Sequence, residues 1–221
     1  MKKKAILLLI IILLTGCTVV RIDANNIDNI INIILSKNNN LYNRVGKGYK
    51  YYVPRGVNYI DTDELNDKLY SKGNYYYLYV DAVSYYYNID YEYQVDDNAY
   101  YSKLIDINGK KGYLEIKKTE NDKYYIEFMY NYSKIETIVD YDDINNAILN
   151  ASYILSTVKF NNNVIKIMLN EDYFVNKEEK YDIFNSKKQS DTFLKYESDE
   201  NKEMIDNSNN SQEELDEEIV E

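Results

Sequence analysis

Residues 99–132, AYYSKLIDINGKKGYLEIKKTENDKYYIEFMYNY, decide the fold of this chain of 221 residues. They contain three runs rich in aromatic and β-branched residues, at 99–107, 111–119 and 123–132. Asn108-Gly109 separates the first two runs and is the strongest short signal for a two-residue hairpin turn. Glu120-Asn121-Asp122 joins the second run to the third. Sequential hairpins of this kind predict an antiparallel sheet.

Helical patterns lie on both sides of these hairpins. Ile27, Ile30, Ile31 and Ile34 recur at helical spacing after a capping Asn25 or Asn26, and the helix is expected to fail at 38–40. A second helix, at about 143–158 and capped by Asp142 or Asp143, has one wide apolar face. Local signals also predict a helix from the capping-box pair Asp61 and Glu64 to Gly73, and strands at 75–87 and 164–169. The sequence therefore predicts the α+β class, with an antiparallel sheet of about five or six strands packed by the long helix and the N-terminal helix.

Alternation along the predicted strands gives the sheet two faces. Leu78 and Val80 suit a core, which places Tyr75, Tyr77 and Tyr79 on the opposite face. Tyr113 and Tyr125 fall on the same outward side as those three. Two interpretations stay open for this tyrosine face. It is either a solvent-facing surface that stacks on sugars or grips a protein, or a second core under a further layer.

The N-terminus carries a secretory signal. Three lysines precede ten uninterrupted apolar residues, too few to span a bilayer, and Leu14-Thr15-Gly16-Cys17 follows. That string resembles the lipobox of bacterial lipoproteins, in which cleavage precedes the cysteine and its sulfur receives a diacylglycerol. The resemblance implies that Cys17, the only cysteine of the chain, is lipidated. It also implies an extracytoplasmic protein anchored to the outer face of the bacterial cell membrane.

The expected organisation has four parts. A signal peptide covers 1–16, a lipidated N-terminus and short tether 17–24, a single α+β domain 25–196, and an acidic disordered tail 197–221. The tail holds eleven Asp or Glu and one Lys. Cleavage would remove Lys2, Lys3 and Lys4 and lower the net charge from −11 to −14. Because such a chain repels polyanions in general, no nucleic-acid partner is expected.

Composition also restricts the chemistry. The chain has no histidine and one cysteine, which excludes Ser-His and Cys-His nucleophiles, histidine metal ligands and thiolate zinc sites. No catalytic residue, metal site or cofactor is predicted. Carboxylates remain, so an envelope hydrolase that uses a carboxylate pair is the alternative to a binding protein.

Two short segments that contain basic residues can be compared with known motifs. Arg44 and Arg55, which flank Gly46-Lys47-Gly48, are candidate contacts for an anion. The glycine pair is too short for a phosphate loop. Ser156 and Lys159 match a Ser-x-x-Lys pattern, but without its companion motifs the match is interpreted as coincidence.

The order of hairpins and long helix over residues 75–160 resembles the Mog1/PsbP-like group of small secreted domains. That resemblance implies a binding or assembly role and names no catalytic residue. Together these observations predict a lipid-anchored, non-catalytic module for binding or envelope assembly. Its expected partners are the membrane, through the anchor, and an envelope protein or glycan.

Overall fold

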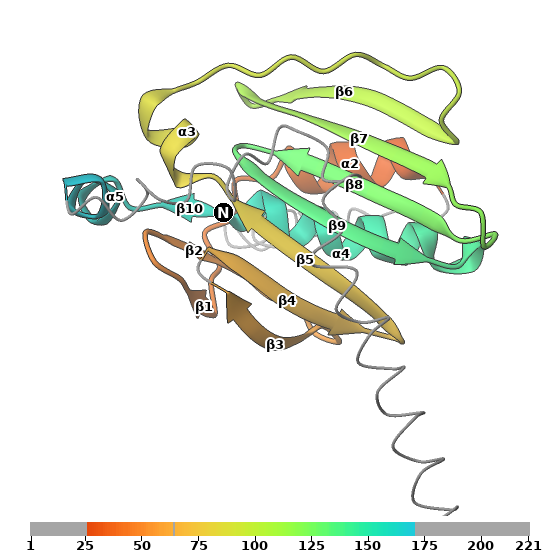
Figure 1. Ribbon diagram of the computed structural model, residues 1–221, viewed down its shortest axis with the longest axis horizontal. Helices are drawn as coiled ribbons and strands as arrows, with labels where there is room; N and C mark the ends of the chain where they lie inside the picture. Colours follow the sequence, from red (N-terminus) through yellow and green to blue (C-terminus); the bar gives the residue numbers. More distant parts are fainter. Residues whose placement is uncertain (1–25, 64, 171–221) are drawn as a thin grey trace, which may run out of the picture. The chain divides into compact units, whose positions relative to one another are not determined.

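The computed structural model describes residues 26–63 and 65–170. Outside these residues lie the predicted signal peptide, Cys17 with its tether, the last part of the predicted domain (171–196) and the acidic tail. In the described part a seven-stranded antiparallel sheet is packed by helices, which confirms the α+β class (Figure 1). Its strands, in spatial order, are β3 (Asn58–Asp63), β4 (Asn66–Ser71), β5 (Asn74–Val80), β9 (Ser133–Val139), β8 (Tyr124–Tyr130), β7 (Lys110–Lys118) and β6 (Tyr101–Ile107).

The hairpins form as the sequence predicts. Asn108 and Gly109 have φ angles of 56° and 70°, and the turn they make joins β6 to β7 with Ile107 opposite Lys110. Positive φ at both central residues is the geometry that matches the twist of the flanking strands. Asp122, with φ of 58°, lies in the next turn, which joins β7 to β8.

The helix predicted between Asp61 and Gly73 is wrong, because β3 and β4 form a hairpin there. Leu65 and Leu69 suggested a helix, since residues four apart share a helical face. A spacing of four also keeps two residues on one face of a strand, where the period is two. Lys72 and Gly73, with φ of 50° and 85°, form the turn into β5. This hairpin adds β3 and β4 to the sheet, and β9, which no predicted strand covered, adds another, so the sheet has seven strands where five or six were predicted.

Two further predictions need correction. The strand predicted at 75–87 ends at Val80, where Asp81 caps helix α3 (Ala82–Tyr87) by accepting a hydrogen bond from Ser84 N at 2.8 Å. Residues 164–169 belong to helix α5 (Asn162–Asn170) and not to a strand, since Ile165 and Met168 are buried three residues apart. In both segments capping and packing outweigh the β-propensity of the side chains.

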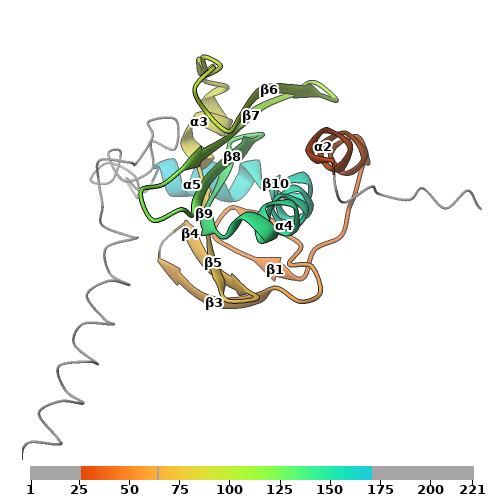
Figure 2. The same ribbon diagram turned by 90° about the vertical axis from the view of Figure 1, so that its right-hand side faces the viewer.

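The main core lies between the sheet and two helices. Helix α2 (Ile27–Leu35) begins at Asn26, whose side chain accepts from Asn29 N, and packs against α4 (Ile144–Thr157). Figure 2 shows both helices on one side of the curved sheet. A short 3₁₀ turn, η1 (Tyr141–Asp143), precedes α4. Asp143 makes no capping bond, contrary to expectation; its carboxylate accepts from Asn74 Nδ2 at 3.1 Å.

A second, small sheet closes one end of the domain. Its strands are β1 (Arg44–Val45), β2 (Tyr49–Tyr51) and β10 (Lys159–Phe160), with β2 in the middle. Strand β10 leaves α4 directly, and Thr157 Oγ1 at the end of that helix accepts from Tyr52 N at 2.9 Å. The small sheet thereby brings segments more than a hundred residues apart to one place.

Candidate functional site

The outer face of the large sheet carries the predicted tyrosines, and the structure buries most of them. The alternation is confirmed: Leu78, Val80, Leu114 and Ile126 lie in the main core, with the five tyrosines opposite. Tyr77, Tyr79, Tyr113 and Tyr125 are 1%, 2%, 3% and 9% exposed, and Tyr75 is half-buried. Burial of this kind is what the second-core interpretation requires.

Carboxylates occupy the same outer face. Glu115, Glu127 and Glu136 stand directly opposite one another on β7, β8 and β9. All three are buried. Like charges in directly opposite positions destabilise a sheet. Such a row therefore needs positive charges or hydrogen-bond donors beside its carboxylates.

Compensation comes from within the fold. Lys134 on β9 is fully buried, with Nζ 2.7 Å from Glu136 Oε1 and 3.7 Å from Glu127 Oε1. Lys117 Nζ lies 3.0 Å from Glu115 Oε1. Tyr113 OH donates to Glu127 Oε1 and Tyr93 OH to Glu115 Oε2.

The tyrosines of this face are held as neutral donors. The ring of Tyr93 stacks on Tyr113 with centroids 4.0 Å apart. Burial, together with the Glu127 carboxylate, raises the pKa of Tyr113 far above its ordinary value, and burial does the same for Tyr125. Opposite positions separated by about 5 Å would suit a retaining glycosidase pair. Here the carboxylates are buried and bonded to Lys134, Lys117 and tyrosines, an arrangement that supports a role inside the fold.

The two arginines expected to contact an anion take separate positions. Arg44 lies on β1 with its guanidinium 3.4 Å from the centre of the Tyr59 ring. Arg55 is exposed in the turn before β3. Neither lines the pocket described next, although Val45, which follows Arg44, does.

That pocket lies at the small sheet and has a volume of about 730 Å³. The turn between β1 and β2 forms one wall, and two glycines make the turn fit. A Cβ on Gly46 would stand 2.4 Å from the Tyr49 ring. Gly48 has φ of 82°, and a Cβ there would lie 2.9 Å from Ile165 of α5. Because only glycine avoids both conflicts, Gly46-Lys47-Gly48 is required by the backbone approach and by the left-handed conformation.

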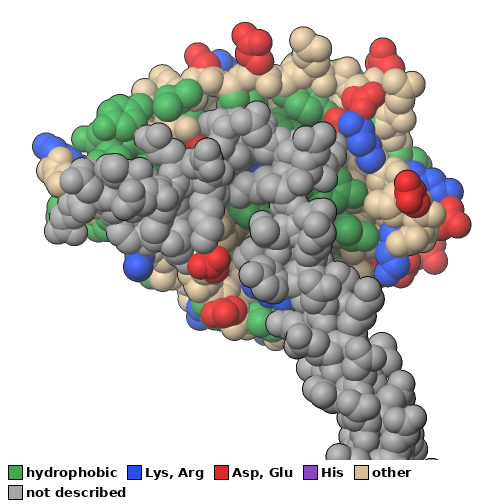
Figure 3. Space-filling model, viewed as in Figure 1, with side chains coloured by type: hydrophobic (Ala, Val, Ile, Leu, Met, Phe, Trp, Pro, Cys, Tyr) green, Lys and Arg blue, Asp and Glu red, His purple; other side chains and the backbone are tan. Residues whose placement is uncertain are grey.

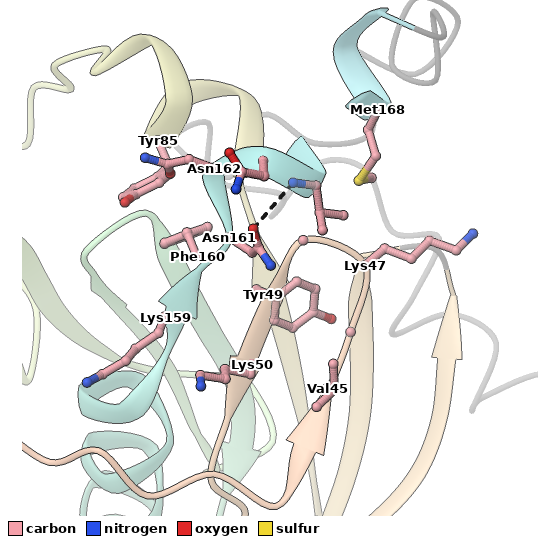
Figure 4. A pocket seen from close by; sticks show the side chains of 14 residues that line it. Val45, Lys47, Tyr49, Lys50, Tyr85, Lys159, Phe160, Asn161, Asn162 and Met168 are labelled. Atoms are coloured by element: carbon pink, nitrogen blue, oxygen red, sulfur yellow. Dashed lines mark hydrogen bonds between the residues drawn. The ribbon is translucent and has the colours of Figure 1, made fainter. Parts of the chain in front are cut away.

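Strand β10 and the start of α5 form the other wall. Asn161 N donates to Gly48 O at 2.8 Å, and Asn161 Oδ1 accepts from Val164 N, which caps α5 (Figure 4). Asn161, Asn162 and Asn163 are all exposed. Tyr85 from α3 stacks on Phe160 with ring centroids 3.8 Å apart.

Lysines give the pocket its charge. Lys47, Lys50 and Lys159 line it, and none of the described residues of its lining is Asp or Glu. Lys50 and Lys159 stand directly opposite each other on β2 and β10, a like-charge pair. Lys50 Nζ lies 3.9 Å from the centre of the Tyr42 ring, and Lys159 Nζ donates to Asn40 Oδ1. Neither of these two lysines forms an ion pair with the described part of the chain.

A signal for these lysines was present in the sequence and was missed. Residues 29–60 contain five Lys or Arg and no Asp or Glu. Residues 144–170 contain Lys159 and Lys166 and again no acidic residue. In a chain of net charge −11 these are long intervals without a carboxylate. The pairing of β2 with β10 joins the two intervals.

Metal sites, membrane-spanning helices and similar proteins do not assign a function to this chain. Across residues 26–63 and 65–170, no three acidic, histidine or cysteine side chains are arranged to hold a metal ion. Within the same residues no helix is both long and apolar enough to cross a bilayer. Neither a protein-family model nor a curated protein sequence matches this chain.

Proposed function

We propose that this protein is a lipid-anchored, extracytoplasmic binding module, and that its ligand is an anionic glycan held at the lysine pocket. One observation carries the proposal: Lys50 and Lys159 stand opposite each other at an open pocket and form no ion pair with any residue in 26–63 or 65–170, in a chain of net charge −11. The lipobox resemblance of residues 14–17 supports the anchored location. A binding role is favoured over a hydrolase because the carboxylate row is buried on the large sheet, whereas the pocket lies at the small sheet.

The electrostatics favour an anion at Lys50 and Lys159. Two ammonium groups on directly opposite strand positions repel each other, which costs about 0.2–1 kcal/mol in a sheet. A phosphate or carboxylate placed between them replaces repulsion with two attractions. Ion pairs with an exposed lysine are individually weak, so affinity must come from several contacts.

The uncharged lining suits a sugar. Three successive asparagine amides, each able to donate and to accept, lie at the rim and match the hydroxyl groups of a saccharide. The stacked rings of Tyr85 and Phe160 form an apolar wall against which the C–H face of a sugar can pack.

Titration of the full-length protein in detergent with trigalacturonate, and with neutral maltotriose as the reference sugar, tests this function. We expect trigalacturonate to bind more tightly, and the double variant K50Q/K159Q to weaken it about tenfold. The matched control is K118Q/K123Q, which removes the same charge. Those two lysines face carboxylates, Lys118 Nζ at 2.7 Å from Asp122 and Lys123 Nζ at 3.9 Å from Asp140. Figure 3 shows basic and acidic side chains intermingled at the right-hand end of the molecule, over the turn between β7 and β8.

Two results would overturn the assignment. One is equal binding of maltotriose and trigalacturonate. The other is an equal loss of affinity in K50Q/K159Q and in K118Q/K123Q. The anchor is tested separately: Cys17→Ala should give a product without lipid that no longer stays with membranes, and a variant that keeps an acyl chain would contradict the lipobox interpretation.

A further inference from the structure

One face of the small sheet carries a row of three side chains from three strands. Val45 on β1 stands directly opposite Lys50 on β2, and Lys50 stands directly opposite Lys159 on β10. Because directly opposite residues of antiparallel strands share a face, all three side chains lie on the same side of the sheet. Figure 4 shows them across the lower part of the pocket. The two cations therefore have an apolar neighbour in register with them.

Further exposed apolar side chains adjoin this row. Val45 is 75% exposed, and Leu41 and Tyr42, which precede β1, are 56% and 53% exposed. The ring of Tyr42 lies against Lys50, whose Nζ is 3.9 Å from the ring centre. Exposed apolar side chains are ordinary when scattered, but a group of them beside polar residues marks an interaction surface. Leu41, Tyr42 and Val45 thus form an apolar rim of the lysine pocket.

The charge beside the apolar rim is positive. The rim and Lys50 belong to the interval 29–60, and Lys159 belongs to the interval 144–170, neither of which contains an Asp or Glu. Apolar and tyrosine side chains next to lysines are typical of protein surfaces that contact a bilayer. In such surfaces the apolar side chains reach the boundary between headgroups and acyl chains, while the lysines meet anionic headgroups. The composition of this face therefore favours a ligand that has both an anionic and a lipid part.

The proposed anchor places a bilayer within reach of this face. Cys17 precedes Asn26, the first described residue, by nine residues, which span at most roughly 30 Å when fully extended. Helix α2 begins at the next residue and is about 14 Å long. Asn40, which accepts from Lys159 Nζ, follows the last residue of that helix by only five residues. A lipid on Cys17 therefore holds the apolar rim near the membrane, where a high local concentration of lipid favours even weak contacts.

We infer that the ligand of the lysine pocket is an anionic glycolipid of the membrane that holds the protein. This rests on the proposed function and specifies its ligand. The charged sugar lies at Lys50 and Lys159, and the lipid end of the ligand contacts the apolar rim. A soluble glycan would leave the rim in water. A second copy of the chain fits this face less well, because a symmetric contact would bring the same two lysines of both copies together.

Binding is measured on the full-length protein in detergent with four probes: dioctanoyl glucuronosyl glycerol, its neutral galactosyl counterpart, glucuronosyl glycerol without acyl chains, and dioctanoyl phosphatidylglycerol. We expect the glucuronosyl lipid to bind most tightly of the four. Its affinity should exceed that of glucuronosyl glycerol by about tenfold or more, because burial of methylene groups adds to affinity.

Variants of the apolar rim test which part of the protein supplies this gain. Leu41→Ser should weaken binding of the glucuronosyl lipid about threefold and leave binding of trigalacturonate unchanged, and L41S/V45S should weaken the lipid about tenfold. The matched control is Leu104→Ser on β6, because Leu104 is 53% exposed and the large sheet, not the pocket, carries it. The melting temperature of each variant verifies its fold.

The outcomes separate this inference from the function on which it rests. Equal or absent binding of the glucuronosyl lipid and glucuronosyl glycerol, with Leu41→Ser equal to Leu104→Ser, would overturn the lipid part and leave a pocket for a soluble glycan. Phosphatidylglycerol that binds more tightly than the glucuronosyl lipid would overturn the sugar, and a galactosyl lipid that binds equally well would overturn the anion. A K50Q/K159Q variant that binds trigalacturonate like the unmodified protein would overturn the pocket itself.

Discussion

The outer face of the large sheet and the lysine pocket place charge on neighbouring strands in opposite ways. On the outer face Glu115, Glu127 and Glu136 are in register, and buried Lys134 and tyrosine hydroxyls compensate them. At the pocket Lys50 and Lys159 are also in register, but they are only half-buried and form no ion pair with the described residues. Compensated charge in the interior contributes to structure, whereas uncompensated charge at a surface is suited to a ligand.

Raising the pH should unfold the large sheet through ionisation of the buried tyrosines on its outer face. This is the largest effect that we expect. The pKa of Tyr93 is raised by burial to about 12, and burial raises those of Tyr113 and Tyr125 further. Because the folded pKa lies above the unfolded value of about 10, this stabilisation is complete below about pH 10 and is lost as the pH rises through the folded values. The part of the tyrosinate absorbance that comes from these buried hydroxyls should therefore rise only together with the loss of sheet circular dichroism. A tyrosinate absorbance that reaches its full value while the sheet persists would show that these hydroxyls are accessible.

Lys134→Met should cost about 3–5 kcal/mol of unfolding free energy, because it leaves Glu127 and Glu136 buried without their cation. Urea unfolding measures the loss. K134M/E136Q should recover part of it, and the surface change K123Q should cost little. If Lys134→Met costs no more than K123Q, the network is not a compensated interior.

Tyr77→Ala compares the outer face with the main core. Tyr77 is 1% exposed, so we expect a loss of about 3 kcal/mol, close to that of Ile126→Ala in the main core. Equal losses would make the tyrosine face a second core. A loss below about 0.5 kcal/mol for Tyr77→Ala would instead favour the exposed binding surface.

The smallest effect should come from the pocket. K50Q/K159Q removes a like-charge pair, so the unfolding free energy should stay constant or rise by up to about 0.5 kcal/mol while anion binding falls. Gains of stability with loss of function are typical of binding sites. Denaturation and ligand titration on the same samples measure both. A loss of stability above about 1 kcal/mol would mean that the two lysines support the fold.

Much of this protein was determined by its sequence. Asn108-Gly109 set the register of one hairpin because few other residues accept positive φ at both turn positions. Periodicity located α4, and alternation assigned Tyr77 and Leu78 to opposite faces, since these patterns depend only on the geometry of one element. The two intervals without acidic residues, 29–60 and 144–170, could also be identified from the sequence alone.

Only the tertiary structure decided the rest. Leu65 and Leu69 fit helix and strand alike, and pairing with β3 and β5 selected the strand. Burial of the tyrosine face depends on what packs over it, which no local pattern encodes. Lys50 and Lys159 became opposite neighbours because β10 returns from α4 to β2, more than a hundred residues away in the chain. Each half of such a site leaves a local signal in the sequence, the interval without acidic residues, but the two halves are brought together only when the whole core forms.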